Sequence, residues 1–252
     1  MKEVALPVPR QQVALVTGSS SGIGAAIAAR LSAEGMCVVV NSSRSAEQGA
    51  AFAASLPDAS YVRADVSDEA QAARLVDTVV ERHGRLDVLV NCAGTTRVIA
   101  HSDIAAATPE VWREILGVNV VGTWQVTSAA APHLAEAGPG NVVNISSVAG
   151  DRPVGSSIPY AVSKAALNHM TRLLAAALGP DVRVNAVAPA LTRTPWTEGD
   201  PFFEKVAEKV RSDTPLRRVG ADTDVAEAVW AVLRMSHMTG AVLPVDGGAR
   251  LI

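Results

Sequence analysis

The sequence predicts a single α/β domain, built as a doubly wound parallel sheet with helices on both faces. Three observations support this fold class. Apolar runs of strand length recur along the chain, these runs are continuously apolar rather than alternating, and segments with helical period separate them. Strands that are apolar on both sides suit a parallel sheet covered by helices on both faces. The 252 residues, 48% of them hydrophobic and 19% charged, are enough for one large domain with a substantial core.

The order of the expected elements alternates between strands and helices. The expected strands are Val13–Thr17, Met36–Val40, Leu86–Asn91, Asn141–Ile145 and Val182–Val187. The expected helices, with apolar residues at three- and four-residue intervals, are Ile23–Glu34, Glu69–Arg82, Pro109–Ala137 and Tyr160–Leu178. Residues 1–10 are expected to form a short leader. Residues 190–218 contain three prolines and are expected to form an excursion with a short helix, of the kind that serves as a lid or binding loop.

Composition excludes several classes of protein. The formal net charge is −3 and the basic residues are dispersed, so neither nucleic acid nor a membrane surface is an expected partner. No segment is long and apolar enough for a signal peptide or a membrane span, which favours a cytoplasmic protein. Cys37 and Cys92 lie in separate apolar runs and are expected to be buried thiols. The five histidines are too scattered to predict a metal site.

A glycine-rich loop follows the first expected strand. The segment Thr17–Gly24 has the spacing T-G-x-x-x-G-x-G and leads directly into an alanine-rich helix. Gly18, Gly22 and Gly24 allow a tight turn and a close approach to the backbone, and the start of a helix favours an anion. A simple turn would need the same glycines, but the position after the first strand of a βαβ unit favours dinucleotide binding, as in Rossmann-like folds.

The end of the second strand bears on the choice of nicotinamide cofactor. Ser42 stands where an acidic residue would bind the ribose hydroxyls of NAD, and residues 38–46 contain no Asp or Glu. Arg44 follows and could accommodate a 2′-phosphate, although a solvated arginine at the start of the next helix would look the same. The sequence therefore favours NADP(H) and leaves NAD(H) open. Asp65 is expected near the adenine amino group, or alternatively as a helix cap.

Tyr160 and Lys164 are the expected chemical centre. Their i,i+4 spacing places the phenol and the ammonium group on one face of a helix, where the cation would lower the pKa of the phenol toward neutrality. Such a pair occurs by chance on many helices. Ser147, which follows a strand at the ligand-binding edge of the sheet, is expected to donate a hydrogen bond to a substrate oxygen. Asn119 is expected to be a buried amide bonded to backbone, which is compatible with its holding a proton-relay water.

With these motifs, the chain resembles the short-chain dehydrogenase/reductase family over nearly its whole length. The resemblance implies a catalytic set of Asn119, Ser147, Tyr160 and Lys164, an Asn91–Gly94 step beside the cofactor and a final strand ending at Val245–Gly248. Ala190 and Cys92 depart from the family motifs. The cofactor-binding residues expected in all are Gly18, Ser20, Ser21, Gly22, Ile23, Gly24, Asn41, Ser42, Ser43, Arg44, Asp65, Val66, Asn91, Ala93, Gly94, Tyr160, Lys164, Pro189, Thr192 and Thr194.

The expected function is hydride transfer between NADP(H) and a small-molecule carbonyl or alcohol, with Tyr160 as general acid or base. An NAD(H)-dependent alcohol dehydrogenase of the same family and a non-catalytic NADP-sensing regulator are the alternatives. Trp196, Phe202 and Phe203 are expected to line an apolar substrate pocket or to pack within a helix. The resemblance also implies a homotetramer. The basic residues Lys205, Lys209, Arg211, Arg217 and Arg218 could meet an acyl-carrier protein, or could simply form a solvated face.

Overall fold

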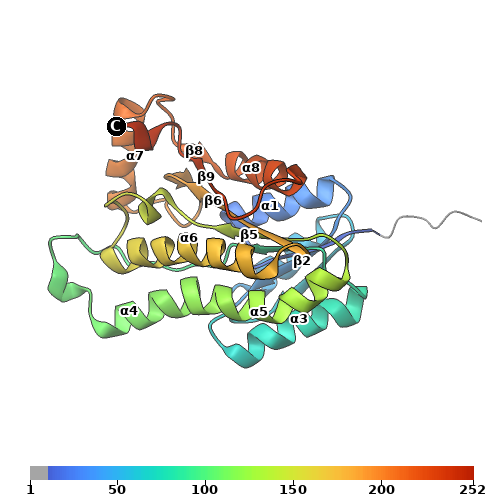
Figure 1. The fold of residues 1–252 in the computed structure, drawn as a ribbon. Helices are drawn as coiled ribbons and strands as arrows, with labels where there is room; N and C mark the ends of the chain where they lie inside the picture. The colour runs from blue at the N-terminus through green and yellow to red at the C-terminus, as the bar shows by residue number, and fades with distance from the viewer. Residues whose placement is uncertain (1–10) are drawn as a thin grey trace, which may run out of the picture.

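A computed structural model describes residues 11–252, and the expected leader at residues 1–10 lies outside this range. Seven parallel strands form one sheet in the order β3-β2-β1-β4-β5-β6-β9. Helices cover both of its faces (Figure 1), so the predicted fold class is confirmed. The strands are β1 (Val13–Val16), β2 (Cys37–Ser42), β3 (Ala59–Arg63), β4 (Val88–Asn91), β5 (Gly140–Ile145), β6 (Val182–Pro189) and β9 (Val242–Val245).

The two faces of the sheet bury separate apolar cores. Ala14 and Val16 of β1 face α1 (Gly22–Ala33), α2 (Ala46–Ala54) and α8 (Asp222–Arg234), whereas Val13 and Leu15 face α3 (Glu69–His83), α5 (Thr123–Glu136) and α6 (Ile158–Leu178). All four of these β1 side chains are at most 3% exposed. Burial on both faces explains why the strands are continuously apolar in the sequence.

The excursion forms a separate small lobe beside the sheet (Figure 1). A two-stranded parallel pair, β7 (Thr192–Arg193) and β8 (Gly220–Ala221), closes its base, and α7 (Pro201–Asp213) lies between them. Short 3-10 turns occur at Ile104–Ala106, Val148–Gly150 and Ala249–Leu251. The expected excursion thus contains one helix, α7, and its role as a lid or binding loop stays a prediction.

The expected single helix over Pro109–Ala137 is wrong in one respect. An α-helix, α4 (Pro109–Leu116), and α5 are joined by one π-helical stretch at Gly117–Gly122. Gly122 packs so closely on the segment after β3 that an added Cβ would lie 2.9 Å from Val66 Cγ2. The Thr123 hydroxyl donates to the Asn119 carbonyl oxygen at 3.1 Å, which satisfies a carbonyl group within the widened turn. Asn119 therefore lies on a π bulge, a feature often found at functional sites.

Both cysteines are free thiols, but each is half-buried rather than buried. Cys37 Sγ lies 3.4 Å from His83 Nδ1, near the amino ends of the strands, and Cys92 follows β4 at the opposite edge. Within the described residues, no helix combines the length and the hydropathy needed to cross a membrane.

Candidate functional site

A cavity of about 520 Å³ opens at the carboxyl edge of the parallel sheet, where β1, β4, β5 and β6 end. β1 is the point at which the chain reverses its direction of winding, because β2 lies on one side of it and β4 on the other. Ligands of open α/β sheets bind at this kind of position. Of the expected site residues, those lining the cavity are Gly18, Ser21, Gly22, Ile23, Gly24, Ala93, Gly94, Ser147, Tyr160, Lys164, Pro189, Thr192 and Thr194.

The glycine-rich loop is held close to the segment after β4. Gly18 has a φ of 63°, and a Cβ there would lie 2.7 Å from Ala93 Cα. Thr17 Oγ1 accepts hydrogen bonds from Cys92 N and Ala93 N, both at 3.1 Å. The loop is therefore fixed before any ligand binds.

The amino terminus of α1 is open to an anion. Ser21 is the N-cap residue, but its side chain makes no capping hydrogen bond, so its hydroxyl and the first amides of the helix have donors to spare. Gly22 has a φ of 53° and lies under the excursion, where an added Cβ would lie 3.2 Å from Thr194 Cβ. This arrangement suits a pyrophosphate held between the helix terminus and the loop above it.

Polar contacts of Asn41 organise the end of β2. Its Oδ1 accepts from Gly18 N at 3.3 Å, and its Nδ2 donates to Val62 O at 3.1 Å and Ala64 O at 3.2 Å. Asn41 thus links the glycine-rich loop to β3 and positions both. It is 1% exposed and acts through the loop rather than by lining the cavity.

The residues after Asn41 surround the expected adenosine end of the site. Ser42 is 7% exposed, and its Oγ lies 2.9 Å from the Tyr61 hydroxyl. Arg44 is exposed, and Arg63 approaches from β3 with Nε donating to Ser43 O at 3.0 Å. The pairing of Ser42 with Arg63 therefore brings one guanidinium group to Ser43, and Arg44 is the next residue along the chain.

Asp65 and Val66 lie just beyond β3. Asp65 Oδ1 accepts hydrogen bonds from Ser67 N at 3.0 Å and Ser67 Oγ at 2.7 Å, and its backbone amide donates to Gln71 Oε1. The cap of α3 is Asp68, which accepts from Gln71 N at 2.9 Å. The alternative role of Asp65 as the helix cap is therefore wrong, and a role near an adenine amino group stays a prediction.

Three residues of the expected catalytic set, Ser147, Tyr160 and Lys164, line the cavity, and Asn119 lies behind them. Lys164 is 6% exposed, and its Nζ lies 5.6 Å from the centre of the Tyr160 ring. A Cβ on Gly94 would lie 3.9 Å from Lys164 Nζ and 3.5 Å from Asn119 Oδ1. Ser147 caps the turn at Val148–Gly150 and forms a hydrogen bond with the Tyr160 phenol.

Asn119 lies one layer behind the cavity wall. It is 1% exposed, accepts from Thr95 N at 2.8 Å, and donates to Thr95 O and Ser163 Oγ, both at 3.0 Å. The expectation of an amide satisfied by backbone is confirmed. Through Thr95 and Ser163, Asn119 fixes the strand-end loop and α6 relative to each other, and it thereby supports both walls beside Lys164.

The proton chemistry differs from the expectation in one respect. Burial raises the pKa of Tyr160 to about 12, although the hydrogen bond with Ser147 opposes the shift. Burial also lowers the pKa of Lys164 to about 8. The Lys164 ammonium donates to Ile145 O at 2.9 Å rather than to the phenol. The lowered Tyr160 pKa expected from the sequence is therefore wrong for the protein by itself.

Comparisons with known proteins agree with this geometry. A family model described as enoyl-(acyl carrier protein) reductase matches residues 18–250. The "Granaticin polyketide synthase putative ketoacyl reductase 2" of Streptomyces violaceoruber is 65% identical, over 99% of this chain and 100% of that protein. The chain belongs to the short-chain dehydrogenase/reductase family.

Solved structures of the family share the whole fold. A short-chain dehydrogenase/reductase from Burkholderia xenovorans superposes with a TM-score of 0.89 at 34% identity, covering 97% of this chain and 100% of that one. The structure of ElxO with NADP bound superposes with a TM-score of 0.87 at 26% identity, covering 96% and 100% of the two chains. The chain is accordingly an oxidoreductase of a family that uses nicotinamide cofactors.

The residues of this short-chain dehydrogenase/reductase fit such a cofactor. Gly18 and Gly24 allow the tight fold of the glycine-rich loop, because a Cβ on Gly24 would lie 2.3 Å from Gly18 O. Ser21 offers an uncommitted hydroxyl, and Pro189 and Thr194 are buried in the opposite wall. Lys164 and Tyr160 lie at the end of the cavity away from the adenosine side, as a ribose and a reacting ring would require.

Sequence reasoning missed Tyr61 and Arg63, and it gave Thr17 and Ser19 no separate role within the glycine-rich loop. Thr17, Ser19 and Tyr61 hold predicted residues in place, and Arg63 adds a cation near Ser43. Trp196, which was expected to line an apolar pocket or to pack within a helix, lines the cavity and contacts Tyr160 edge to face, with ring centroids 6.4 Å apart. The role of Thr17 could have been predicted from its position directly after a strand. The roles of Tyr61 and Arg63 depend on the register between β2 and β3, which the sequence does not show.

Proposed function

We propose that this protein reduces a carbonyl group of a ketoacyl-type or other small-molecule substrate with NADPH, and that Tyr160 delivers the proton. The observation that carries the proposal is the meeting of Tyr160, Ser147 and Lys164 at one end of an apolar cavity. A pure NADP sensor has no need of a buried ammonium group beside a phenol. The 65% identical relative is named as a ketoacyl reductase, which supports the substrate class.

The residues of the chain divide the chemistry as follows. The nicotinamide, when bound, supplies the hydride. Ser147 holds the substrate oxygen by a hydrogen bond, and the Tyr160 hydroxyl gives its proton to that oxygen as negative charge develops there. Lys164 lies close enough to stabilise the phenolate that remains, and its own hydrogen bond to Ile145 O keeps the ammonium group in position. Trp196 and the α7 side chains line the same cavity with apolar surface.

The preference for NADP(H) rests on charge at the end of β2. Arg63 bonds to Ser43 O, the exposed Arg44 follows Ser43 in the chain, and residues 38–46 contain no carboxylate to repel a 2′-phosphate. An arginine in this position accommodates the 2′-phosphate, whereas an acidic residue selects NAD. We therefore propose NADP(H) over NAD(H).

We also propose a homo-oligomer, with the resemblance favouring a tetramer. Val121 and Trp124 are 45% and 51% exposed on the π stretch and α5, and Val162 and Leu173 are 43% and 58% exposed on α6. Large apolar side chains exposed on adjacent long helices are typical of association surfaces. Light scattering coupled to gel filtration measures the assembly directly. An acyl-carrier partner has weaker support, because Lys209 and Arg218 already pair with Asp213 and Asp224.

The function is tested by following NADPH absorbance with a panel of ketones, diketones, quinones and 3-oxoacyl thioesters. Tyr160→Phe is expected to lower kcat by at least about a hundredfold, because it removes the proton donor and leaves the packing intact. Tyr61→Phe is the matched control, since it removes the only other phenol of the chain and is expected to alter cofactor affinity at most. Full turnover in Tyr160→Phe would remove the centre of the proposal. Tight NADPH binding without turnover across the panel would favour the sensor.

A further inference from the structure

The α7 wall of the cavity has little packing of its own. All 13 residues of α7 are described, and Ala207 is the one that is buried. Phe202, Phe203 and Val206 face the cavity from this helix. An element that buries so little apolar surface opens at low free energy unless its ends are fixed. The position of this wall therefore depends on the segments before and after the helix.

The segment at residues 246–252, which we call the strap, holds the end that follows α7. Leu216 N donates to Gly247 O at 3.1 Å. Gly248 has a φ of 87°, and a Cβ there would lie 2.6 Å from Pro215 Cγ, so the strap and the Pro215 ring are in direct contact. Only glycine allows this approach in this backbone conformation.

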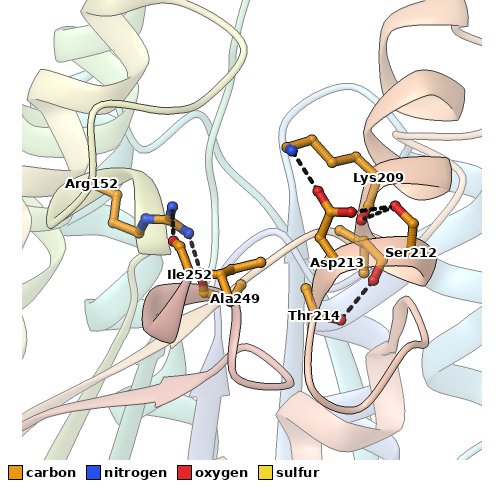
Figure 2. A network of polar contacts seen from close by, with 8 residues as sticks. Arg152, Lys209, Ser212, Asp213, Thr214, Ala249 and Ile252 are labelled. Carbon is orange, nitrogen blue, oxygen red and sulfur yellow. Dashed lines mark hydrogen bonds and ion pairs between the residues drawn. The ribbon is translucent and has the colours of Figure 1, made fainter.

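Arg152 holds the other side of the strap. Its guanidinium donates one hydrogen bond to Ala249 O and a second, at 2.6 Å, to Ile252 O. Figure 2 shows Arg152 reaching the turn that carries Ala249 and Ile252. Arg152 belongs to the loop that starts at Ser147 and carries Val154 and Gly155 into the cavity wall.

The strap itself is stiffened internally. Asp246 accepts hydrogen bonds from Gly248 N at 2.9 Å and Arg250 N at 3.1 Å, and its carbonyl oxygen accepts from Ala249 N at 3.0 Å. Because these hydrogen bonds hold the turn rigid, a shift at one end of the strap is expected to move the other end as well. It connects two cavity walls that come from segments about 60 residues apart in the chain, at Arg152 and Pro215.

We propose that the strap sets the width of the substrate end of the cavity, with Arg152 as the positioning residue that couples the Ser147 loop to α7. This inference rests on the proposed function for its kinetic consequence, but its structural part stands independently. The planar fork of an arginine can donate to two carbonyl oxygens at once, which a lysine cannot do in the same geometry. Loss of the strap contact lets the α7 wall move away from Ser147 and weakens binding of any substrate that touches both walls.

The test uses Arg152→Ala, with Arg113→Ala as a control that removes a surface-exposed ion pair with Glu110 on α4. Hydrogen exchange of the intact protein is measured over residues 201–216. Arg152→Ala is expected to raise exchange there about tenfold, although residue 152 touches none of these residues in the contacts described, and Arg113→Ala is expected to leave it unchanged. Gly248→Ala, which disturbs the contact of the strap with Pro215, is expected to give the same effect. Unchanged exchange over 201–216 in Arg152→Ala would overturn the proposal.

A kinetic arm separates positioning from mere stability. For a ring-bearing ketone that the wild type reduces, Arg152→Ala is expected to raise KM about tenfold. The kcat for a small ketone and the NADPH Kd are expected to stay within about twofold. The KM of Arg152→Lys for the ring-bearing ketone is expected to fall between those of the wild type and Arg152→Ala. An equal loss of kcat for both ketones would contradict the proposal. If the wild type reduces no ketone, the proposed function fails while the exchange measurement still decides the strap.

Discussion

Lys164 lies beside the Tyr160 ring, with its Nζ 5.6 Å from the ring centre, yet it donates its hydrogen bond to Ile145 O. The ammonium group is thus held by the strand end rather than by the phenol. Burial dominates both groups in the protein by itself, raising the pKa of Tyr160 to about 12 and lowering that of Lys164 to about 8. Proton transfer near neutral pH requires a lower Tyr160 pKa, so we expect polar groups of the substrate and the cofactor ribose to lower it when they bind.

The lowered Lys164 pKa predicts a specific pH dependence of stability. Its ordinary value is 10.5, so between about pH 8 and pH 10.5 the unfolded chain binds a proton at Lys164 that the folded chain does not. Stability from this group therefore rises with pH across that window. Across the whole window, the contribution of Lys164 to the free energy of unfolding changes by roughly 3 kcal/mol. Lys164→Met is expected to abolish this rise, measured by urea unfolding at pH 7, 8, 9 and 10.

The raised Tyr160 pKa has the opposite sign and acts at higher pH. Between about pH 10 and pH 12 the folded chain retains a phenol proton that the unfolded chain loses, so stability falls as pH rises there. The Lys164 measurement therefore ends at pH 10. A wild type and a Lys164→Met variant with parallel stability curves from pH 7 to pH 10 would contradict the buried, lowered lysine.

Cofactor discrimination is expected to depend on two arginines. Arg44→Ala and Arg63→Ala are each expected to weaken NADPH binding about three- to tenfold and to leave NADH binding within about twofold, because only the 2′-phosphate gains from the positive charge. Arg63→Ala also removes the hydrogen bond to Ser43 O. Any loss of NADH affinity in this variant therefore measures the structural effect of losing that bond. Fluorescence titration of both cofactors checks the result. Equal losses for the two cofactors would place the arginines in a structural role.

The fold was accessible from sequence because burial leaves a different apolar pattern in the strands and in the helices. Val13–Val16 is apolar at every position since both faces of β1 are covered, and such runs alternating with helical segments indicate a parallel, helix-covered sheet. The glycine-rich loop was predictable for a similar reason, since its position after β1 and before α1 defines its chemistry.

The remaining features arise from contacts between segments that are distant in sequence. The π bulge at Asn119 ends at Gly122, which packs closely on Val66 from a distant segment, and no local pattern predicts this contact. Arg63 reaches the cofactor end only because Ser42 pairs with it across β2 and β3. The Tyr160 pKa was predicted with the wrong sign because helical spacing predicts proximity to Lys164 but not the depth of burial.

Asn119 is expected to contribute to stability as well as to the site. Asn119→Ala leaves Thr95 N and Thr95 O without their buried partners, and each lost partner costs about 1–3 kcal/mol. The variant is expected to lose about 2–6 kcal/mol of unfolding free energy, measured by urea denaturation. Asn141→Ala is the control, because its side chain makes only a local bond to Pro139 O in an exposed position. Equal, small losses in both variants would show that the Asn119 contacts are weak.

The glycine-rich loop offers the sharpest test of cofactor binding. Gly18 and Gly35 both have positive φ values, 63° and 83°, so alanine strains the backbone at each position by roughly 1 kcal/mol. They differ in their surroundings, because a Cβ at Gly18 would lie 2.7 Å from Ala93 Cα whereas nothing lies within 4 Å at Gly35. Gly18→Ala is therefore expected to push the loop away from Ala93 and to weaken NADPH binding at least about tenfold in a fluorescence titration. Gly35→Ala is expected to lower the Tm slightly and leave the NADPH Kd unchanged. Comparable NADPH affinities in the two variants would mean that the cofactor does not use the close approach of Gly18 and Ala93.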